Sequence, residues 1–188
     1  MSDTDQRPLD GLTVGVFVAQ EGTEEVEFSE SNRALAEAGA DVEVLSSDSG
    51  EARTVDDDLE WSESHEVDAT FADVSADDYD ALVVPGGTVG ADTLRADDEA
   101  VALVRDHLAD DGPVASICHG PWVLVEAEAV EGRTLTSYPS LRTDVRNAGG
   151  EWVDEEVVAD DRVVTSRKPD DLAAFTDELV ETFAAASE

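Results

Sequence analysis

The only cysteine of the chain, Cys118, stands at the end of a short apolar run and directly before His119, Gly120 and Pro121, in the segment PVASICHGPW (113–122). The apolar run is typical of a buried strand, and Pro121 suits the first turn of a helix. A cysteine at such a strand-to-helix turn has the geometry of a nucleophile elbow. The start of the helix would favour the thiolate and lower the pKa of the thiol. The competing interpretation is a buried and inert structural cysteine.

His119 follows the cysteine directly, but adjacent side chains on such a turn usually diverge. We therefore expect the backbone N–H of His119, more than its ring, to act at this site. It would form an oxyanion hole with a second N–H from Gly86 or Gly87. The other two histidines, His65 and His107, are expected to have structural or solvent roles. A zinc site needs three or four ligands, so with three His and one Cys we expect no metal, and nothing indicates an organic cofactor.

An acidic residue follows the first predicted strand, where Glu24 or Glu25 could face Cys118. A carboxyl group buried beside a thiol would have its pKa raised by desolvation. In its protonated form it could donate a hydrogen bond to the thiolate. The residues alone do not choose between the two, because the chain holds 47 acidic side chains.

Strands alternating with helices must position these residues. Short apolar or alternating runs predict strands over 12–19, 41–47, 80–87, 113–118 and 133–138, and a hairpin over 155–168. Helical spacing predicts helices over 24–39, 97–112, 120–130, 141–150 and 170–186, while the polar residues 50–71 suit a hairpin or an edge segment. This order predicts a mainly parallel sheet covered on both faces, with the site at the carboxyl ends of the strands.

Composition sets limits on the partners. The 188 residues carry 47 acidic and 11 basic side chains, a net charge of −36, spread along the whole chain. Such a surface would repel nucleic acid and anionic membranes, so neither is an expected partner. Dispersed acidity favours adaptation to a very salty cytosol. We expect one domain over 1–188, with residues 1–10 flexible, and a soluble cytoplasmic protein, since neither a signal peptide nor a membrane-spanning run is evident.

Three segments resemble the ThiJ/PfpI family, and in particular its PfpI-type members, described as intracellular proteases, glyoxalase III or deglycases. They are PVASICHGPWVLVEA (113–127), GRTLTSYPSLRTDVRNAGGEWVDEEVV (132–158) and VVTSRKPDDLAAF (163–175). The resemblance implies a flavodoxin-like fold, a three-layer α/β sandwich related to class I glutamine amidotransferases. It also implies Cys118 as the nucleophile, Glu24 as the family's conserved acid, and Gly87 and His119 N–H as the oxyanion hole.

The same resemblance concerns assembly. In PfpI-type proteins the histidine is partnered by an acid from a neighbouring subunit, in the loop after the Pro-Gly-Gly turn, and Asp92 is the acid near that place here. The family is dimeric and often hexameric, so a homo-oligomer is expected.

These observations favour a cysteine-dependent hydrolase that acts on a carbonyl carbon. The substrate would be an α-oxoaldehyde, its adduct on an amino group, or a peptide bond, and the sequence does not choose among them. Two alternatives remain. The first is a non-catalytic protein of oxidative stress or redox sensing that uses the same reactive Cys118, because an exposed low-pKa thiol oxidises readily. The second is a chaperone-like oligomer.

The acidic composition predicts that the fold depends on salt. At molar salt the Debye length is only about 3 Å, so repulsion between the carboxylates is largely screened. Dialysis to low ionic strength should unfold or dissociate the protein, as followed by circular dichroism and by size-exclusion chromatography. An unchanged spectrum and an unchanged oligomer size after dialysis would contradict this prediction.

Overall fold

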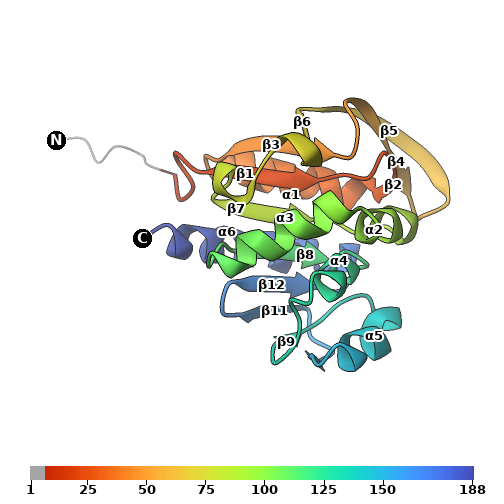
Figure 1. Ribbon diagram of the computed structural model, residues 1–188, viewed down its shortest axis with the longest axis vertical. Coiled ribbons are helices and arrows are strands. Elements are labelled where there is room, and N and C mark those ends of the chain that lie inside the picture. The colour runs from red at the N-terminus through yellow and green to blue at the C-terminus, as the bar shows by residue number, and fades with distance from the viewer. Residues whose placement is uncertain (1–6) are drawn as a thin grey trace.

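A seven-stranded sheet forms the centre of the computed structural model, which describes residues 7–188 (Figure 1). In sheet order its strands are β11 (Val157–Asp160), β12 (Val163–Ser166), β8 (Val114–Ile117), β7 (Ala81–Val84), β1 (Thr13–Phe17), β3 (Asp41–Ser46) and β6 (Ala69–Thr70). All neighbours are parallel except β11 and β12, which form the antiparallel hairpin predicted over 155–168.

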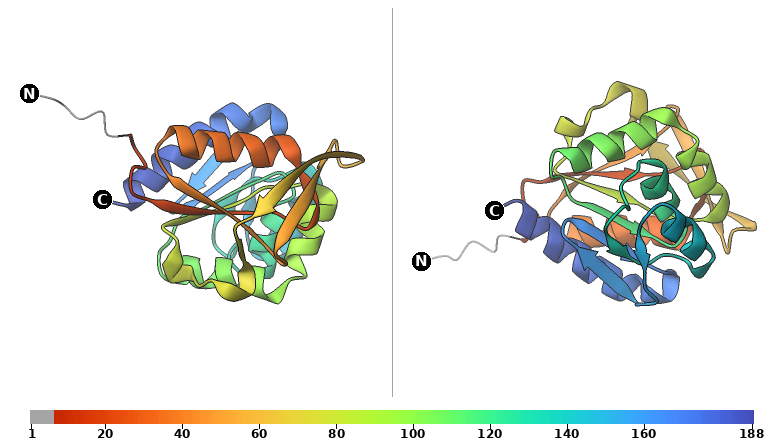
Figure 2. Two further views of the ribbon diagram at one scale, coloured as in Figure 1. Left: turned by 90° about the horizontal axis from the view of Figure 1, so that it is seen from above. Right: turned by 60° about the horizontal axis from the view of Figure 1, so that its bottom comes forward.

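Helices cover both faces of this sheet, which confirms the predicted three-layer α/β sandwich. On one face lie α1 (Glu25–Glu37) and α6 (Leu172–Ala186), and on the other lie α2 (Thr88–Arg95), α3 (Asp98–Ala109) and α4 (Pro121–Glu126) (Figure 2). The last helix, α5 (Arg142–Asn147), packs beside a small parallel pair, β9 (Thr134–Leu135) and β10 (Glu151–Trp152). Within residues 7–188 no helix is long and apolar enough to cross a membrane.

The strands alternate between two hydrophobic cores, as side chains of period two require. On β7, Ala81 and Val83 join the core under α1 and α6, while Leu82 and Val84 join the core under α3 and α4. Both faces of the strand are therefore apolar, which explains why its sequence is a continuous apolar run.

A second, three-stranded sheet stands beside the carboxyl ends of the central strands. It contains β2 (Glu21–Glu24) and the antiparallel hairpin of β4 (Gly50–Asp56) and β5 (Glu60–Val67). The hairpin confirms the expectation for residues 50–71, and it extends past the edge of the central sheet near α2 (Figure 1). Its tip, residues 57–59, reaches the site described below.

Three local expectations are corrected. The predicted helix 120–130 ends at Glu126, because Glu128 takes a left-handed conformation with φ of 57°. The predicted strand 133–138 is only two residues long, because beyond Leu135 the N–H groups of Thr136 and Tyr138 leave the strand ladder and donate to the Thr165 hydroxyl (3.0 Å) and the Cys118 carbonyl (2.8 Å). Helix α2 is not among the predicted helices, because the sequence pattern leaves residues 88–95 in the loop after the Pro-Gly-Gly turn.

The expected flexibility of residues 1–10 stays a prediction, although one residue of this segment contacts the core. The Leu9 side chain is fully buried and its N–H donates to the carbonyl of Ala38 (2.9 Å). Residues 1–6 lie outside the described part of the chain.

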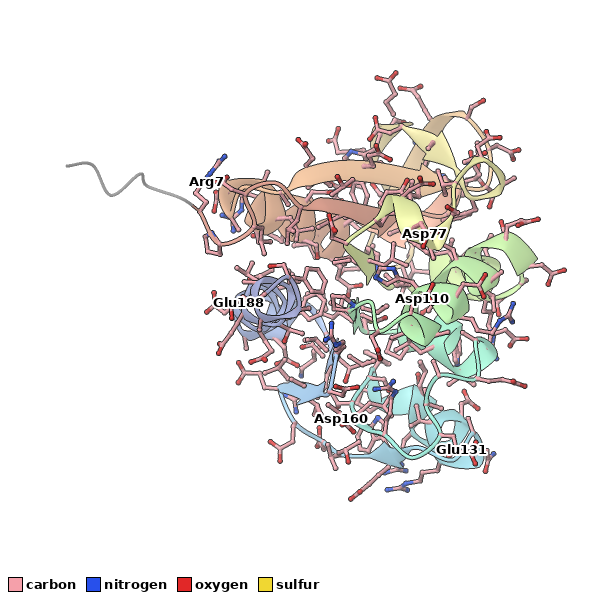
Figure 3. All side chains as sticks on the ribbon, turned by 60° about the vertical axis from the view of Figure 1, so that its left-hand side comes forward. Arg7, Asp77, Asp110, Glu131, Asp160 and Glu188 are labelled. Carbon is pink, nitrogen blue, oxygen red and sulfur yellow. The ribbon has the colours of Figure 1, made fainter. Side chains whose placement is uncertain are left out.

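Acidic side chains are dispersed over the molecule as they are along the sequence. Carboxylate oxygens project all around its outline, and the labelled Asp77, Asp110, Glu131, Asp160 and Glu188 come from widely separated segments (Figure 3).

Candidate active site

Cys118 occupies a strained turn between β8 and α4. Its backbone has a φ of +62°, a left-handed conformation that costs a non-glycine residue on the order of 1–3 kcal/mol. Neighbouring backbone groups hold this turn. The N–H of Cys118 donates to the carbonyl of Ser166 (3.1 Å), and its own carbonyl accepts from the N–H of Tyr138 (2.8 Å). The conformation is that of a nucleophile elbow, as the sequence predicts.

Two glycines leave room for the elbow. A Cβ atom at Gly86 would lie 2.8 Å from the Cβ of Cys118 and 2.7 Å from Oε1 of Glu27. A Cβ at Gly120 would collide with the hydroxyl of Ser116 and the carbonyl of Val84. The crowding explains why glycine stands at both positions.

The carboxyl group beside the Cys118 thiol belongs to Glu27. Its Oε1 accepts the N–H of Gly86 (2.8 Å), and its side chain is fully buried. Oε2 has no hydrogen-bond partner within residues 7–188, and the carboxyl group as a whole interacts with the Cys118 side chain. Burial raises the pKa of Glu27 to about 8, so this carboxyl is mainly protonated at neutral pH.

The two acids that the sequence offered for this place lie elsewhere. Glu24 turns its carboxylate to the backbone N–H groups of Asp57 (2.8 Å) and Asp58 (3.1 Å) at the tip of the β4–β5 hairpin. Burial nevertheless raises its pKa, and these two N–H groups oppose that rise. Glu25 binds the ring of His65 (2.7 Å). The expectation that Glu24 or Glu25 faces Cys118 is therefore wrong.

Helical spacing could have found Glu27. The buried face of α1 contains Glu27, Phe28, Ser31 and Leu35, whereas Val26 is 37% exposed. Glu27 thus stands four and eight residues before two buried positions, on the face that a helix turns to the core. An acidic residue on an apolar helix face is the signal in the sequence that indicates Glu27.

The Cys118 thiol is buried, with 6% of the residue exposed. Burial and the negative charge of an ionised Glu27 raise its pKa, while the N–H groups of Gly87 and His119, directed at the sulfur, lower it. The net direction is upward, opposite to the sequence expectation. Since Glu27 is protonated at neutral pH, the repulsion from its carboxylate is largely absent there. When the thiol loses its proton, the two N–H groups stabilise the resulting thiolate and the neutral Glu27 does not repel it.

The ring of His119 also contacts the sulfur, with Nδ1 3.2 Å from Sγ. The prediction that the two adjacent side chains diverge is therefore wrong. Burial lowers the pKa of His119, while the charge of Asp58 opposes this effect. Tyr138 stacks on the ring (4.6 Å between centroids) and Trp122 meets it edge-on (5.2 Å), so the imidazole is held in place.

The other ring nitrogen of His119, Nε2, faces two hydroxyl groups, Thr88 Oγ1 at 3.3 Å and Ser140 Oγ at 3.4 Å. Thr88 is bound in turn by Asp58. Asp92, the predicted acid, lies exposed on α2, and the described chain shows no contact between it and His119. Its role across a subunit interface stays a prediction.

No metal site accompanies this arrangement in the described part of the chain, where no three His, Cys, Asp or Glu side chains are grouped to hold an ion. The site brings together the Cys118 thiol, the neutral carboxyl of Glu27, the imidazole of His119, and the N–H groups of Gly87 and His119 that are directed at the sulfur. This set can add a sulfur nucleophile to a carbonyl carbon and move protons around it.

Residues 13–182 match the DJ-1/PfpI family. The chain belongs to this family. It is 44% identical to General stress protein 18 of Bacillus subtilis over 156 residues, 82% of this chain and 88% of that protein. It is 40% identical to a deglycase of Pyrococcus horikoshii over 165 residues, 88% of this chain and 96% of that protein.

A solved structure extends the comparison. Drosophila melanogaster DJ-1beta superposes with a TM-score of 0.82 at 30% identity, covering 92% of this chain and 90% of that one. For this DJ-1/PfpI protein the family and the fold are therefore established.

The raised pKa of Glu27 predicts a specific pH dependence of stability in this DJ-1/PfpI protein. Between pH 4.5 and about 8 the folded state holds a proton on Glu27 that the unfolded state has lost, so the group lowers stability as pH rises. At 1.36 kcal/mol per pKa unit, the loss approaches about 5 kcal/mol at pH 8 as an upper bound. Glu27→Gln cannot titrate, so its stability should fall less between pH 5 and pH 8.

Urea unfolding of wild type and Glu27→Gln at pH 5, 6.5 and 8, at one fixed high salt concentration, measures this difference. All other titrating groups are common to both proteins and cancel in the comparison. Parallel curves for the two proteins would show that Glu27 is ionised in the folded state.

Proposed function

We propose that this protein is a cysteine-dependent hydrolase of small carbonyl compounds, with an α-oxoaldehyde or its adduct on an amino group as the substrate. The observation that carries the proposal is the position of the Cys118 sulfur. It lies beside the neutral carboxyl of Glu27, 3.2 Å from Nδ1 of His119, and in front of the N–H groups of Gly87 and His119.

Access to the sulfur supports a small substrate. Cys118 and His119 are each only 6% exposed, and Tyr138 and Trp122 pack around the imidazole. A peptide bond would have to bring two chain segments to this buried atom, whereas a three-carbon aldehyde can reach it alone. The relative from Pyrococcus horikoshii that is named a deglycase supports the same substrate class.

In the first step, Sγ of Cys118 attacks the aldehyde carbon while His119 takes the thiol proton. The new S–C bond converts the carbonyl into a hemithioacetal, and the carbonyl oxygen is protonated to a hydroxyl. The N–H groups of Gly87 and His119 would stabilise the negative charge on that oxygen as it develops. With an adduct on an amino group, the S–C bond replaces the C–N bond, and the amine leaves with a proton.

In the second step, a proton moves from the former aldehyde carbon to the neighbouring carbonyl carbon through an enediol. This shift gives a 2-hydroxy thioester with no net oxidation, and it needs groups that release and accept protons. Glu27 and His119 are placed for this exchange. Water then cleaves the thioester to a 2-hydroxy acid and restores the thiol.

Turnover of methylglyoxal in high salt tests the proposal. Cys118→Ala should lose at least about 10³-fold in kcat/KM, because the nucleophile is absent. Glu27→Gln should also be strongly impaired, since an amide cannot exchange a proton. Lactate formation, followed by a coupled assay, gives the rate.

Glu25→Gln is the matched control, because it removes a carboxylate on the same turn of α1 that faces His65 and not the sulfur. It should retain the wild-type rate. A fluorogenic peptide is assayed in parallel. Turnover of the peptide but not of methylglyoxal by wild type would replace the aldehyde with a peptide bond as substrate, and equal activity of Cys118→Ala on both would refute the proposed nucleophile.

A redox role is the second candidate, and the protonated Glu27 beside the sulfur favours it. A neutral carboxyl can donate a hydrogen bond to a cysteine sulfinate and so stabilise that oxidation state. Mild peroxide should then add two oxygen atoms to Cys118 in wild type, as measured by intact mass, and Glu27→Gln should shift the product distribution. A thiol that stays unmodified would remove this candidate.

A further inference from the structure

We infer that Asp58 is a positioning residue that sets the tautomer of His119 through the hydroxyl of Thr88, so that the Nδ1 lone pair faces Cys118. The inference deepens the proposed function and rests on it for its catalytic meaning. The proton arrangement itself can be measured without any substrate.

Asp58 binds Thr88 at two points. Its Oδ1 accepts the backbone N–H of Thr88 (2.6 Å), and its Oδ2 accepts the hydroxyl (3.0 Å). The same hydroxyl oxygen lies 3.3 Å from Nε2 of His119. A continuous chain of hydrogen-bonding groups therefore runs from Asp58 through Thr88 and His119 to the Cys118 sulfur.

The number of hydrogens on this chain fixes its direction. An ionised carboxylate only accepts, so the single hydroxyl hydrogen of Thr88 points to Asp58. The hydroxyl can then only accept from Nε2, which must carry the imidazole hydrogen. Neutral imidazole has one N–H, so Nδ1 is left with a lone pair 3.2 Å from Sγ. This is the tautomer that can take the thiol proton.

The other groups around the ring do not impose this direction. Ser140 Oγ lies 3.4 Å from Nε2, and its hydroxyl can either donate or accept. Tyr138 stacks on the face of the ring and offers no hydrogen bond to Nε2, and Glu27 interacts with the Cys118 thiol and not with Nε2. Asp58 is thus the one carboxylate connected to Nε2 in the described chain.

The hairpin tip is built to hold Asp58 in this place. Asp57 and Asp58 both have left-handed backbones, with φ of 50° and 64°, a costly conformation for residues other than glycine. The carboxylate of Glu24 binds the N–H groups of both residues and stabilises the turn. Glu24, expected from the sequence to touch the thiol, instead supports the residue that orients the histidine.

A purely structural explanation also exists, because Asp58 binds the free N–H at the start of α2 and would stabilise that helix as a cap. Two substitutions separate the explanations. Asp58→Asn keeps an oxygen for the N–H of Thr88, but its NH₂ group donates to the hydroxyl. The hydroxyl hydrogen is then free to turn to Nε2, which favours hydrogen on Nδ1. Thr88→Val removes the hydroxyl and leaves the capped N–H in place.

Nitrogen-15 NMR of histidine-labelled protein gives the direct test, with His119 assigned by a His119→Gln variant. Wild type should show hydrogen on Nε2, and Thr88→Ser, which keeps the hydroxyl, should show the same. Asp58→Asn should move a large share of the population to Nδ1–H, and Thr88→Val should also lose the preference. Asp57→Asn removes the neighbouring charge without touching Thr88 and is the matched control.

Reactivity gives the second readout. The rate constant for alkylation of Cys118 by neutral iodoacetamide should fall about 10- to 100-fold in Asp58→Asn. The kcat for methylglyoxal should fall by a similar factor, with little change in KM. Both factors lie below the loss of about 10⁴ that follows removal of the acid in a directly bonded triad. Asp57→Asn should stay near wild type. Unchanged tautomer and alkylation rate in Asp58→Asn and Thr88→Val would overturn the inference. If the tautomer shifts in Asp58→Asn and Thr88→Val as expected, but wild type does not turn over methylglyoxal, only the proposed function is refuted.

Discussion

The left-handed backbone of Cys118 is the constraint on which the site depends. At this φ, the sulfur and the ring of the next residue meet at 3.2 Å, although adjacent side chains usually point apart. The same turn directs the N–H of His119 at the sulfur. Gly86 and Gly120 allow the crowding that results, and Ser166 and Tyr138 fix the turn from either side. The conformational cost is therefore offset by backbone hydrogen bonds from β12 and from the segment after β9.

Burial then determines the chemistry of the ionisable groups. Glu27 and the thiol share a space with little water, where a second negative charge is unfavourable. At neutral pH both groups are therefore protonated, since burial raises the pKa of Glu27 to about 8 and raises that of the thiol above its ordinary value. His119, whose pKa burial also lowers, is neutral in the same range and can accept a proton. The many carboxylates on the surface contrast with the neutral carboxyl of Glu27 at the centre.

Sequence reasoning predicted the fold and the elbow, because both depend on local patterns. The apolar runs of β1, β7 and β8 and the Cys-His-Gly-Pro turn are each visible in a few adjacent residues. The acids of the site were not predicted correctly, because their identity depends on which face of α1 is buried and on which residues the tip of the β4–β5 hairpin contacts. The burial of Glu27 can be predicted from the helical spacing of α1. Asp58 was not, since nothing in residues 56–60 indicates contact with Thr88, which is 30 residues away in the chain.

The separate small sheet has a consequence for how the site comes apart. The thiol and the imidazole are neighbours in the chain, and their geometry persists as long as the core around β8 is intact. Asp58 is carried by the β4–β5 hairpin, whose outer strand β5 is largely exposed and belongs to a different sheet. Segments of this kind open locally at a lower free energy than the whole fold. The molecule thus has two levels of order, an intact nucleophile and a complete proton path, and the second can be lost while the first remains.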